Sequence, residues 1–169
     1  MQNYFSVFSL PTAFDLDVAA LEKRYFDAQR QSHPDRLVGK SAPERQQAIS
    51  QSMLVNEAYA GLRSPLERAR HLLLLQGISV GSEQDSVKPS HSLLTEIMEL
   101  REALAEAETS RQVERIEVGN AGSKEKTIDE LSSAFQSGDL PRAAQLTIRL
   151  GYQVKMDDEI RIKKKGLAA

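Results

Sequence analysis

The sequence predicts an all-α fold in two helical parts. Nearly every segment with regularly spaced apolar residues has them three and four residues apart, the spacing of an amphipathic helix. No segment keeps the polar and apolar alternation of a half-buried strand. Two capping boxes, Ser41–Glu44 and Ser64–Glu67, each place a proline in the first turn and mark helix starts. These three observations together favour helices throughout.

A short helix is expected at about residues 3–9, ending before Pro11. It carries three of the nine aromatic residues of the chain, and we expect their rings to lie in the core: Tyr4, Phe5 and Phe8. Asp17 is a good N-cap for a second helix that runs to about Gln31. Its apolar residues fall on one narrow arc: Val18, Leu21, Tyr25 and Ala28.

A third helix should begin after Ser41 and run to about Arg63, and a fourth should follow Ser64 and end at Gly77. The predicted buried stripe of the third helix is Val55, Ala58, Tyr59 and Leu62. The fourth helix is expected to turn Leu66, Ala69 and Leu73 inward.

His33, Pro34 and Asp35 lie between the second and third helices. Pro34 fixes its own φ and pushes His33 out of the helical region, so the tripeptide ends a helix and holds two polar side chains at a bend. The connection at 32–41 is longer than the usual range of about 2 to 8 residues between packed helices. We therefore expect the tripeptide to be displayed at a loop tip.

Taken alone, the tripeptide could be only a helix stop and a turn. An enzymatic interpretation would use His33 as a general base oriented by Asp35, but no serine or cysteine nucleophile pattern accompanies them. Metal binding would have two ligands at most here, because His71, expected to be exposed or half-buried, and His91, expected at a helix start, lie on other elements. We expect no catalytic residue, no metal and no cofactor, so the chain is not predicted to be an enzyme.

The context of the tripeptide gives it more meaning. An aromatic helix and a helix with outward basic residues precede it, Arg36 follows it, and the next helix ends in Val55–Leu62. This order resembles a J-domain over about residues 3–76, and the domain is expected to span 1–76. The resemblance implies docking to an ATP-bound heat-shock chaperone and stimulation of its ATPase. The residues expected to bind the chaperone are His33, Pro34, Asp35, Lys23, Arg24, Arg30 and Arg36.

Physical chemistry is consistent with that role. Asp35 is a compact anion that can accept paired hydrogen bonds from an arginine of the partner. Pro34 restricts the backbone beforehand, which lowers the entropy lost on binding.

A linker is predicted at 77–89, where glycine, serine and small polar residues replace the apolar pattern. Beyond it, residues 90–169 should form an antiparallel three-helix bundle. Helical segments are expected at about 92–108, 110–118, 124–137 and 140–165. The glycines at 119 and 122 are expected to interrupt the middle helix, and Gly138-Asp139 to separate the last two.

The first bundle helix has an apolar seam and an outward acidic stripe. The seam is Leu93, Ile97, Leu100, Leu104 and Ala107. Such a stripe is usually a solvated helix face. Two apolar residues beside it, Leu94 and Met98, favour a partner interface, because methionine suits adaptable contacts and exposed apolar groups mark binding sites.

A J-domain, a linker and a bundle containing residues 99–104, Glu-Leu-Arg-Glu-Ala-Leu, together resemble the HscB family of iron–sulfur cluster assembly co-chaperones. The resemblance covers nearly the whole chain. It implies that the bundle binds an iron–sulfur scaffold protein of the IscU type, which the J-domain delivers to a chaperone ATPase of the HscA type. A J-protein for a different client is the alternative. The implied scaffold-binding residues are Leu94, Thr95, Met98, Glu99, Glu102, Glu106 and Tyr152.

Composition excludes several other classes of function. The 22 basic and 24 acidic residues leave a net charge of -2, so no overall field favours nucleic acid or a membrane surface. With no cysteine, the chain has no disulfide, thiolate nucleophile or sulfur-ligated metal. Lys163 to Lys165 suit the negative end of the last helix. The longest aliphatic run, Leu72–Leu75, is far short of the about 20 residues that span a bilayer, and with no signal peptide recognised we expect a cytoplasmic protein.

Overall fold

The computed structural model describes residues 2–31, 39, 41–81 and 87–168. Within these ranges the chain forms seven α-helices and no strand, which confirms the predicted all-α class. The chain divides into two compact units: Met1–Leu75 holds the first four helices, and Gln76–Ala169 holds the last three. Over the described ranges, no helix combines the length and apolarity needed to cross a bilayer.

The first unit begins with α1 (Tyr4–Val7), which ends two residues earlier than the sequence suggested. Asn3 caps it, because its side-chain oxygen accepts a hydrogen bond from the backbone N–H of Phe5 at 3.0 Å. Phe5 and Phe8 are buried, as predicted, whereas Tyr4 is half-buried. This short helix therefore supplies the aromatic part of the core.

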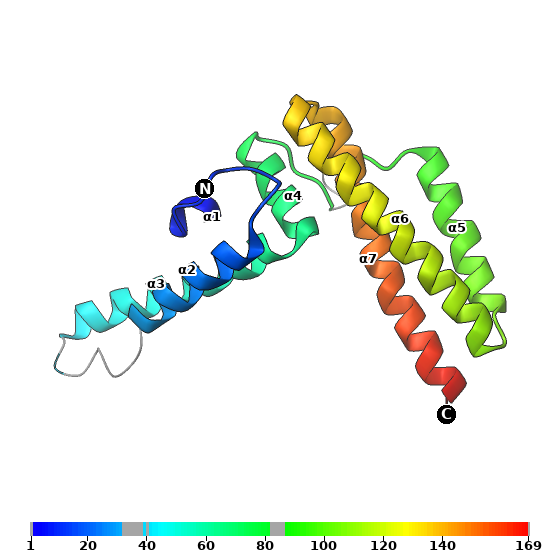
Figure 1. The fold of residues 1–169 in the computed structure, drawn as a ribbon, viewed down its shortest axis with the longest axis horizontal. Helices are drawn as coiled ribbons and strands as arrows, with labels where there is room; N and C mark the ends of the chain where they lie inside the picture. The colour runs from blue at the N-terminus through cyan, green and yellow to red at the C-terminus, as the bar shows by residue number, and fades with distance from the viewer. Residues whose placement is uncertain (1, 32–38, 40, 82–86, 169) are drawn as a thin grey trace. The chain divides into compact units, whose positions relative to one another are not determined.

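The helices α2 (Val18–Gln31) and α3 (Ala42–Arg63) lie side by side as an antiparallel hairpin (Figure 1). Asp17 caps α2 as predicted, since its side chain accepts from the N–H of Ala20 at 3.0 Å. The predicted capping box at Ser41–Glu44 opens α3. Tyr25 and Tyr59 stack across the hairpin with ring centroids 3.9 Å apart. Aromatic stacking thus joins the two helices where their seam is only half-buried.

Helix α4 (Pro65–Leu75) closes the first unit. The predicted inward residues of α4 are all buried: Leu66, Ala69 and Leu73. His71 is also buried, which corrects the prediction of an exposed or half-buried side chain. Its Nε2 accepts the backbone N–H of Tyr4 at 3.0 Å, and its ring stacks on Tyr4 with centroids 4.1 Å apart. His71 therefore satisfies a donor that the first turn of α1 leaves without a helical partner.

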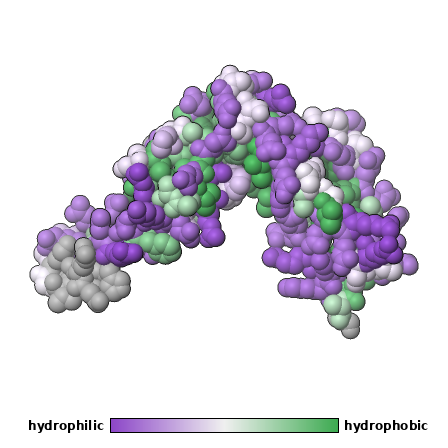
Figure 2. All heavy atoms as spheres, viewed as in Figure 1, coloured by the Kyte–Doolittle hydropathy of each residue, from purple (hydrophilic) through white to green (hydrophobic). Residues whose placement is uncertain are grey.

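The second unit is a three-helix bundle of α5 (His91–Glu106), α6 (Ser110–Ser137) and α7 (Leu140–Ala168), in which consecutive helices run in opposite directions (Figure 1). Ser90 caps α5, so His91 stands at a helix start as predicted. Gly138 ends α6 with a positive φ of 72°, the left-handed conformation in which glycine is favoured. On the face shown in Figure 2, hydrophilic residues dominate this unit.

The predicted interruption at Gly119 and Gly122 is wrong, because α6 continues unbroken through both. A glycine inside a helix costs about 1 kcal/mol relative to alanine. Tertiary contacts offset that cost: the buried Asn120 donates from Nδ2 to the Gln153 carbonyl at 3.0 Å and to the Asp157 carboxylate at 2.7 Å. Polar contacts with α7 thus hold the middle of α6 where local propensity is weakest.

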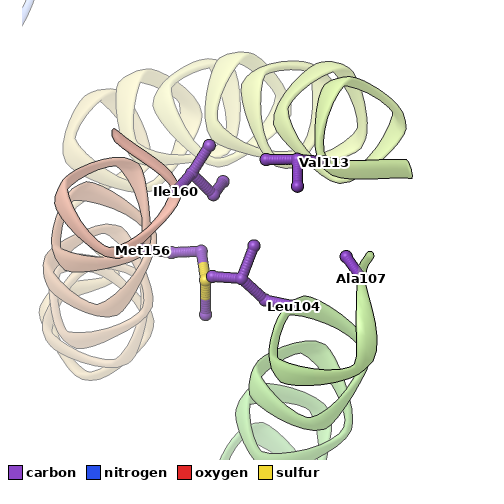
Figure 3. Close-up of a cluster of buried hydrophobic side chains, with 5 residues drawn as sticks. All are labelled: Leu104, Ala107, Val113, Met156 and Ile160. Atoms are coloured by element: carbon purple, nitrogen blue, oxygen red, sulfur yellow. The ribbon is translucent and has the colours of Figure 1, made fainter. Parts of the chain in front are cut away.

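A cluster of buried side chains from all three bundle helices closes the end of the bundle near the α5–α6 turn (Figure 3). Leu104 and Ala107 come from the end of α5, and Val113 from the start of α6. Met156 and Ile160 project from α7 toward them. This cluster fixes the last turns of α5 firmly in the bundle.

Candidate functional site

The tripeptide motif of the first candidate surface lies outside the described residues. The same applies to the arginine that follows it, so the structure describes nothing of His33, Pro34, Asp35 and Arg36. Their chaperone-binding role stays a prediction.

The three basic residues predicted on α2 are all exposed, but they do not share one face. Lys23 and Arg30 are seven residues apart and lie on the same side of the helix. Arg24 points elsewhere: its Nη1 donates to the carbonyl oxygens of Phe8 and Ser9, at 2.6 and 2.8 Å. Arg24 therefore ties α2 to the segment after α1, a structural contact that the sequence did not reveal.

The second candidate surface lies on the outer side of α5. Its apolar seam is buried as predicted at Leu93, Ile97, Leu104 and Ala107, whereas Leu100 is only half-buried. All six predicted scaffold-binding residues of α5 are exposed: Leu94, Thr95, Met98, Glu99, Glu102 and Glu106. With 70 % of its surface exposed, Met98 is the most prominent apolar side chain among them.

The seventh predicted residue, Tyr152, is half-buried on α7. Helices α5 and α7 run parallel, because α5 residues pair with α7 residues in the same order: Glu96 with Arg149, then Arg101 with Glu159. Tyr152 lies between the two α7 members of these pairs and is therefore level with the middle of α5. The structure brings it to the same stretch of the bundle as Met98. We call the seven residues on α5 and α7 the docking surface.

Arg101 is a residue of this region that sequence reasoning did not single out. Its guanidinium makes three hydrogen bonds to the Glu159 carboxylate, from Nε at 3.2 and 3.0 Å and from Nη2 at 2.7 Å. The hydrogen bonds that Arg101 donates to the Glu159 carboxylate raise the pKa of Arg101, and the nearby Tyr152 acts in the same direction. A single arginine within the acidic run at 99–102 is the sequence signal that could have drawn attention to it.

A cleft of about 370 Å³ lies between α5, α6 and α7, on the side of α5 opposite the docking surface. Its apolar lining includes Leu93, Ile97, Leu100 and Ile116. Glu96 and Arg149, paired at 2.9 Å, also line it. The cleft and the docking surface therefore occupy different sides of the same helix.

The acidic residues of the docking surface are suited to binding a protein partner. Across the described ranges, no three His, Asp or Glu side chains are grouped so as to hold a metal ion. The carboxylates of Glu99, Glu102 and Glu106 are exposed beside the apolar Leu94 and Met98. This combination of side chains can bind a protein surface that is both apolar and basic, through burial and charge pairing.

Comparisons with known proteins agree over both units. A family model described as the HSCB C-terminal oligomerisation domain matches residues 89–161. The mouse iron–sulfur cluster co-chaperone protein HscB is 36 % identical over 98 % of this chain and 70 % of its own length. The Proteus mirabilis co-chaperone protein HscB is 35 % identical, covering 94 % of this chain and 93 % of that protein. The crystal structure of the human co-chaperone protein HscB matches with a TM-score of 0.90 at 34 % identity, over 97 % of this chain and 83 % of that chain.

Proposed function

Because the chain belongs to the HscB family of iron–sulfur cluster co-chaperones, we propose that it links a scaffold protein to a chaperone ATPase. In this proposal its first unit is a J-domain that stimulates a heat-shock chaperone of the HscA type. Its second unit binds an iron–sulfur scaffold protein of the IscU type. Family membership over nearly the full length is the observation that carries the proposal.

The hairpin of the first unit supports the chaperone-binding half of the proposal. Helices α2 and α3 lead into and out of the segment that contains the tripeptide. Lys23 and Arg30 add two exposed positive charges on one side of α2. An anion and a helix with exposed cations can dock on a partner with complementary charges, which raises the rate and specificity of association.

The exposed side of α5 supports the scaffold-binding half. Leu94 and Met98 have 37 % and 70 % of their surfaces exposed, although apolar side chains of this size are usually buried. They stand beside three exposed carboxylates on the same helix. Burial of the apolar groups by a partner would supply affinity, while the carboxylates would select a basic partner surface.

The ATPase rate of the chaperone, measured with and without the scaffold, tests both halves in one assay. The full-length chain is expected to raise the rate, and to raise it further when the scaffold is added. Failure of the chain to stimulate the chaperone would overturn the chaperone-binding half.

Variants of the second unit, tested in the same assay, distinguish an IscU-type scaffold from a different client protein. Met98→Ala and Glu102→Ala should each reduce the scaffold-dependent increase without changing the increase caused by the chain alone. If both variants bind the scaffold as the wild type does, the client of the second unit is a different protein.

A further inference from the structure

The Arg101–Glu159 ion pair is the most extensively hydrogen-bonded link between α5 and α7 in the described part of the second unit. Three hydrogen bonds of 2.7, 3.0 and 3.2 Å join the guanidinium to both carboxylate oxygens. Such paired bonding fixes the relative orientation of the two groups, which a single contact does not. Both side chains are also partly shielded from water, with 40 % and 29 % of their surfaces exposed.

The pair lies at a helix turn where the inward residue of α5 is less completely buried than its neighbours one turn before and after. Ile97 and Leu104 are buried on either side of this turn, but the inward residue between them, Leu100, is half-buried and lines the cleft. On the cleft side, the packing against Leu100 is therefore less complete than in a closed core. Leu100 still packs against the cluster that contains Leu104 and Met156, and the Arg101–Glu159 pair adds a polar link between α5 and α7 at this level.

The pair also joins the two parts of the docking surface. Arg101 lies three residues after Met98 and seven after Leu94, so all three are on one side of α5. Glu159 is seven residues after Tyr152 and shares its side of α7. A shift of α5 along or around its axis would separate the apolar residues of α5 from Tyr152.

The pairing also accounts for a positive charge in an acidic surface. In the sequence Arg101 lies two residues after Glu99 and one before Glu102, and both carboxylates are exposed. Residues one or two apart on a helix do not face each other, and the guanidinium of Arg101 is turned to Glu159 instead, so the carboxylates of Glu99 and Glu102 remain exposed to a basic partner.

We propose that Arg101 and Glu159 form a positioning clamp that holds α5 against α7, so that Leu94, Met98 and Tyr152 present one surface to the scaffold protein. The inference rests on the proposed function of the second unit. Neither residue of the clamp is required to touch the scaffold.

The bundle offers a matched control in Glu96 and Arg149. This second ion pair joins the same two helices at 2.9 Å but lies on the cleft side of α5. Its loss removes a charge pair between α5 and α7 without removing the contact beside the docking surface. Glu96→Ala is therefore expected to change scaffold affinity by less than about twofold, the scale of a partly exposed ion pair.

The test is titration calorimetry of an IscU-type scaffold into the full-length chain, with helicity of each variant checked by circular dichroism. Arg101→Ala and Glu159→Ala should each weaken binding about three- to tenfold. The double alanine variant should bind no more weakly than either single variant. The exchanged pair, Arg101→Glu with Glu159→Arg, should restore affinity, which a direct contact of Arg101 with the scaffold would not explain.

Two outcomes would overturn the clamp while leaving the proposed function intact. In the first, Met98→Ala weakens binding but both clamp variants bind normally. In the second, Arg101→Ala weakens binding, Glu159→Ala does not and the exchange fails to restore it, which would make Arg101 a direct contact. If Met98→Ala also binds normally, the proposed function of the second unit fails and the clamp fails with it.

Discussion

The two units place their candidate partner-binding residues in different structural settings. In the first unit, the tripeptide belongs to the connection between α2 and α3, whereas the buried residues that the structure describes lie on the helices and on the segment between α1 and α2. In the second unit, the docking surface lies on helices whose opposite sides form the core, and two helices contribute to it. The first setting is expected to separate binding from packing, whereas the second makes binding depend on packing.

This difference predicts how the units respond to mutation. A substitution in the connection should change function without changing stability. A substitution in the bundle can weaken binding either by removing a contact or by moving a helix, so each variant there needs a structural control. The following experiments test that distinction, from the largest expected effect to the smallest.

The largest effect is expected for His33→Gln in the first unit. If the tripeptide binds the chaperone, this change should abolish stimulation of its ATPase while helicity and scaffold affinity remain those of the wild type. The measurement is the steady-state ATPase rate with increasing amounts of the full-length chain. His91→Gln, at an exposed position that begins α5, is the control. Undiminished stimulation by His33→Gln would remove the chaperone-binding half of the proposal.

A stability effect follows for Leu62→Ala on α3. Leu62 is fully buried, so the change should lower the free energy of unfolding by about 2 to 5 kcal/mol through lost burial and a residual cavity. The matched control on the same helix is Met53→Ala, because Met53 is 67 % exposed and should cost less than about 0.5 kcal/mol. Urea denaturation followed by circular dichroism provides both values. Equal costs for the two changes would contradict the assigned core.

A smaller, purely functional effect is expected for Met98→Ala. Loss of this exposed side chain should weaken scaffold binding about tenfold, equivalent to about 1.4 kcal/mol. Stability should hardly change, since 70 % of the residue is exposed. The control is Val118→Ala on α6, which is 72 % exposed and is not part of the docking surface. Equal scaffold affinities for the two variants would contradict the assignment of Met98 to the docking surface.

The sequence predicted the helices well because their starts and ends are local. Asp17, Ser41 and Gly138 act within one turn of their own position, and each has the predicted role in the structure. The outward side of α5 was also predictable, since helical spacing alone separates Met98 from Ile97.

The parts that the sequence did not predict depend on residues far apart in the chain. Asn120 holds α6 together at its glycines by bonding to α7, 33 residues away. The buried His71 accepts a hydrogen bond from the backbone N–H of Tyr4 in α1, which is 67 residues earlier in the chain. Arg101 finds its anion 58 residues later. Local spacing carries no information on such pairs until the helices are packed.

The smallest expected effect concerns pH and again contrasts the units. Burial lowers the pKa of His71 in the folded chain, so below about pH 6.5 the unfolded chain binds more protons than the folded one. The free energy of unfolding should therefore be highest above this pH and should fall as the pH decreases from about 7. Protonation of Nε2 also breaks the hydrogen bond that it accepts from the Tyr4 N–H. Urea denaturation at several pH values should show a steeper loss for the wild type than for His71→Gln. The exposed His91, changed to Gln, is the control in the second unit. Parallel pH profiles for the wild type and His71→Gln would show that the buried imidazole does not govern the acid sensitivity of the first unit.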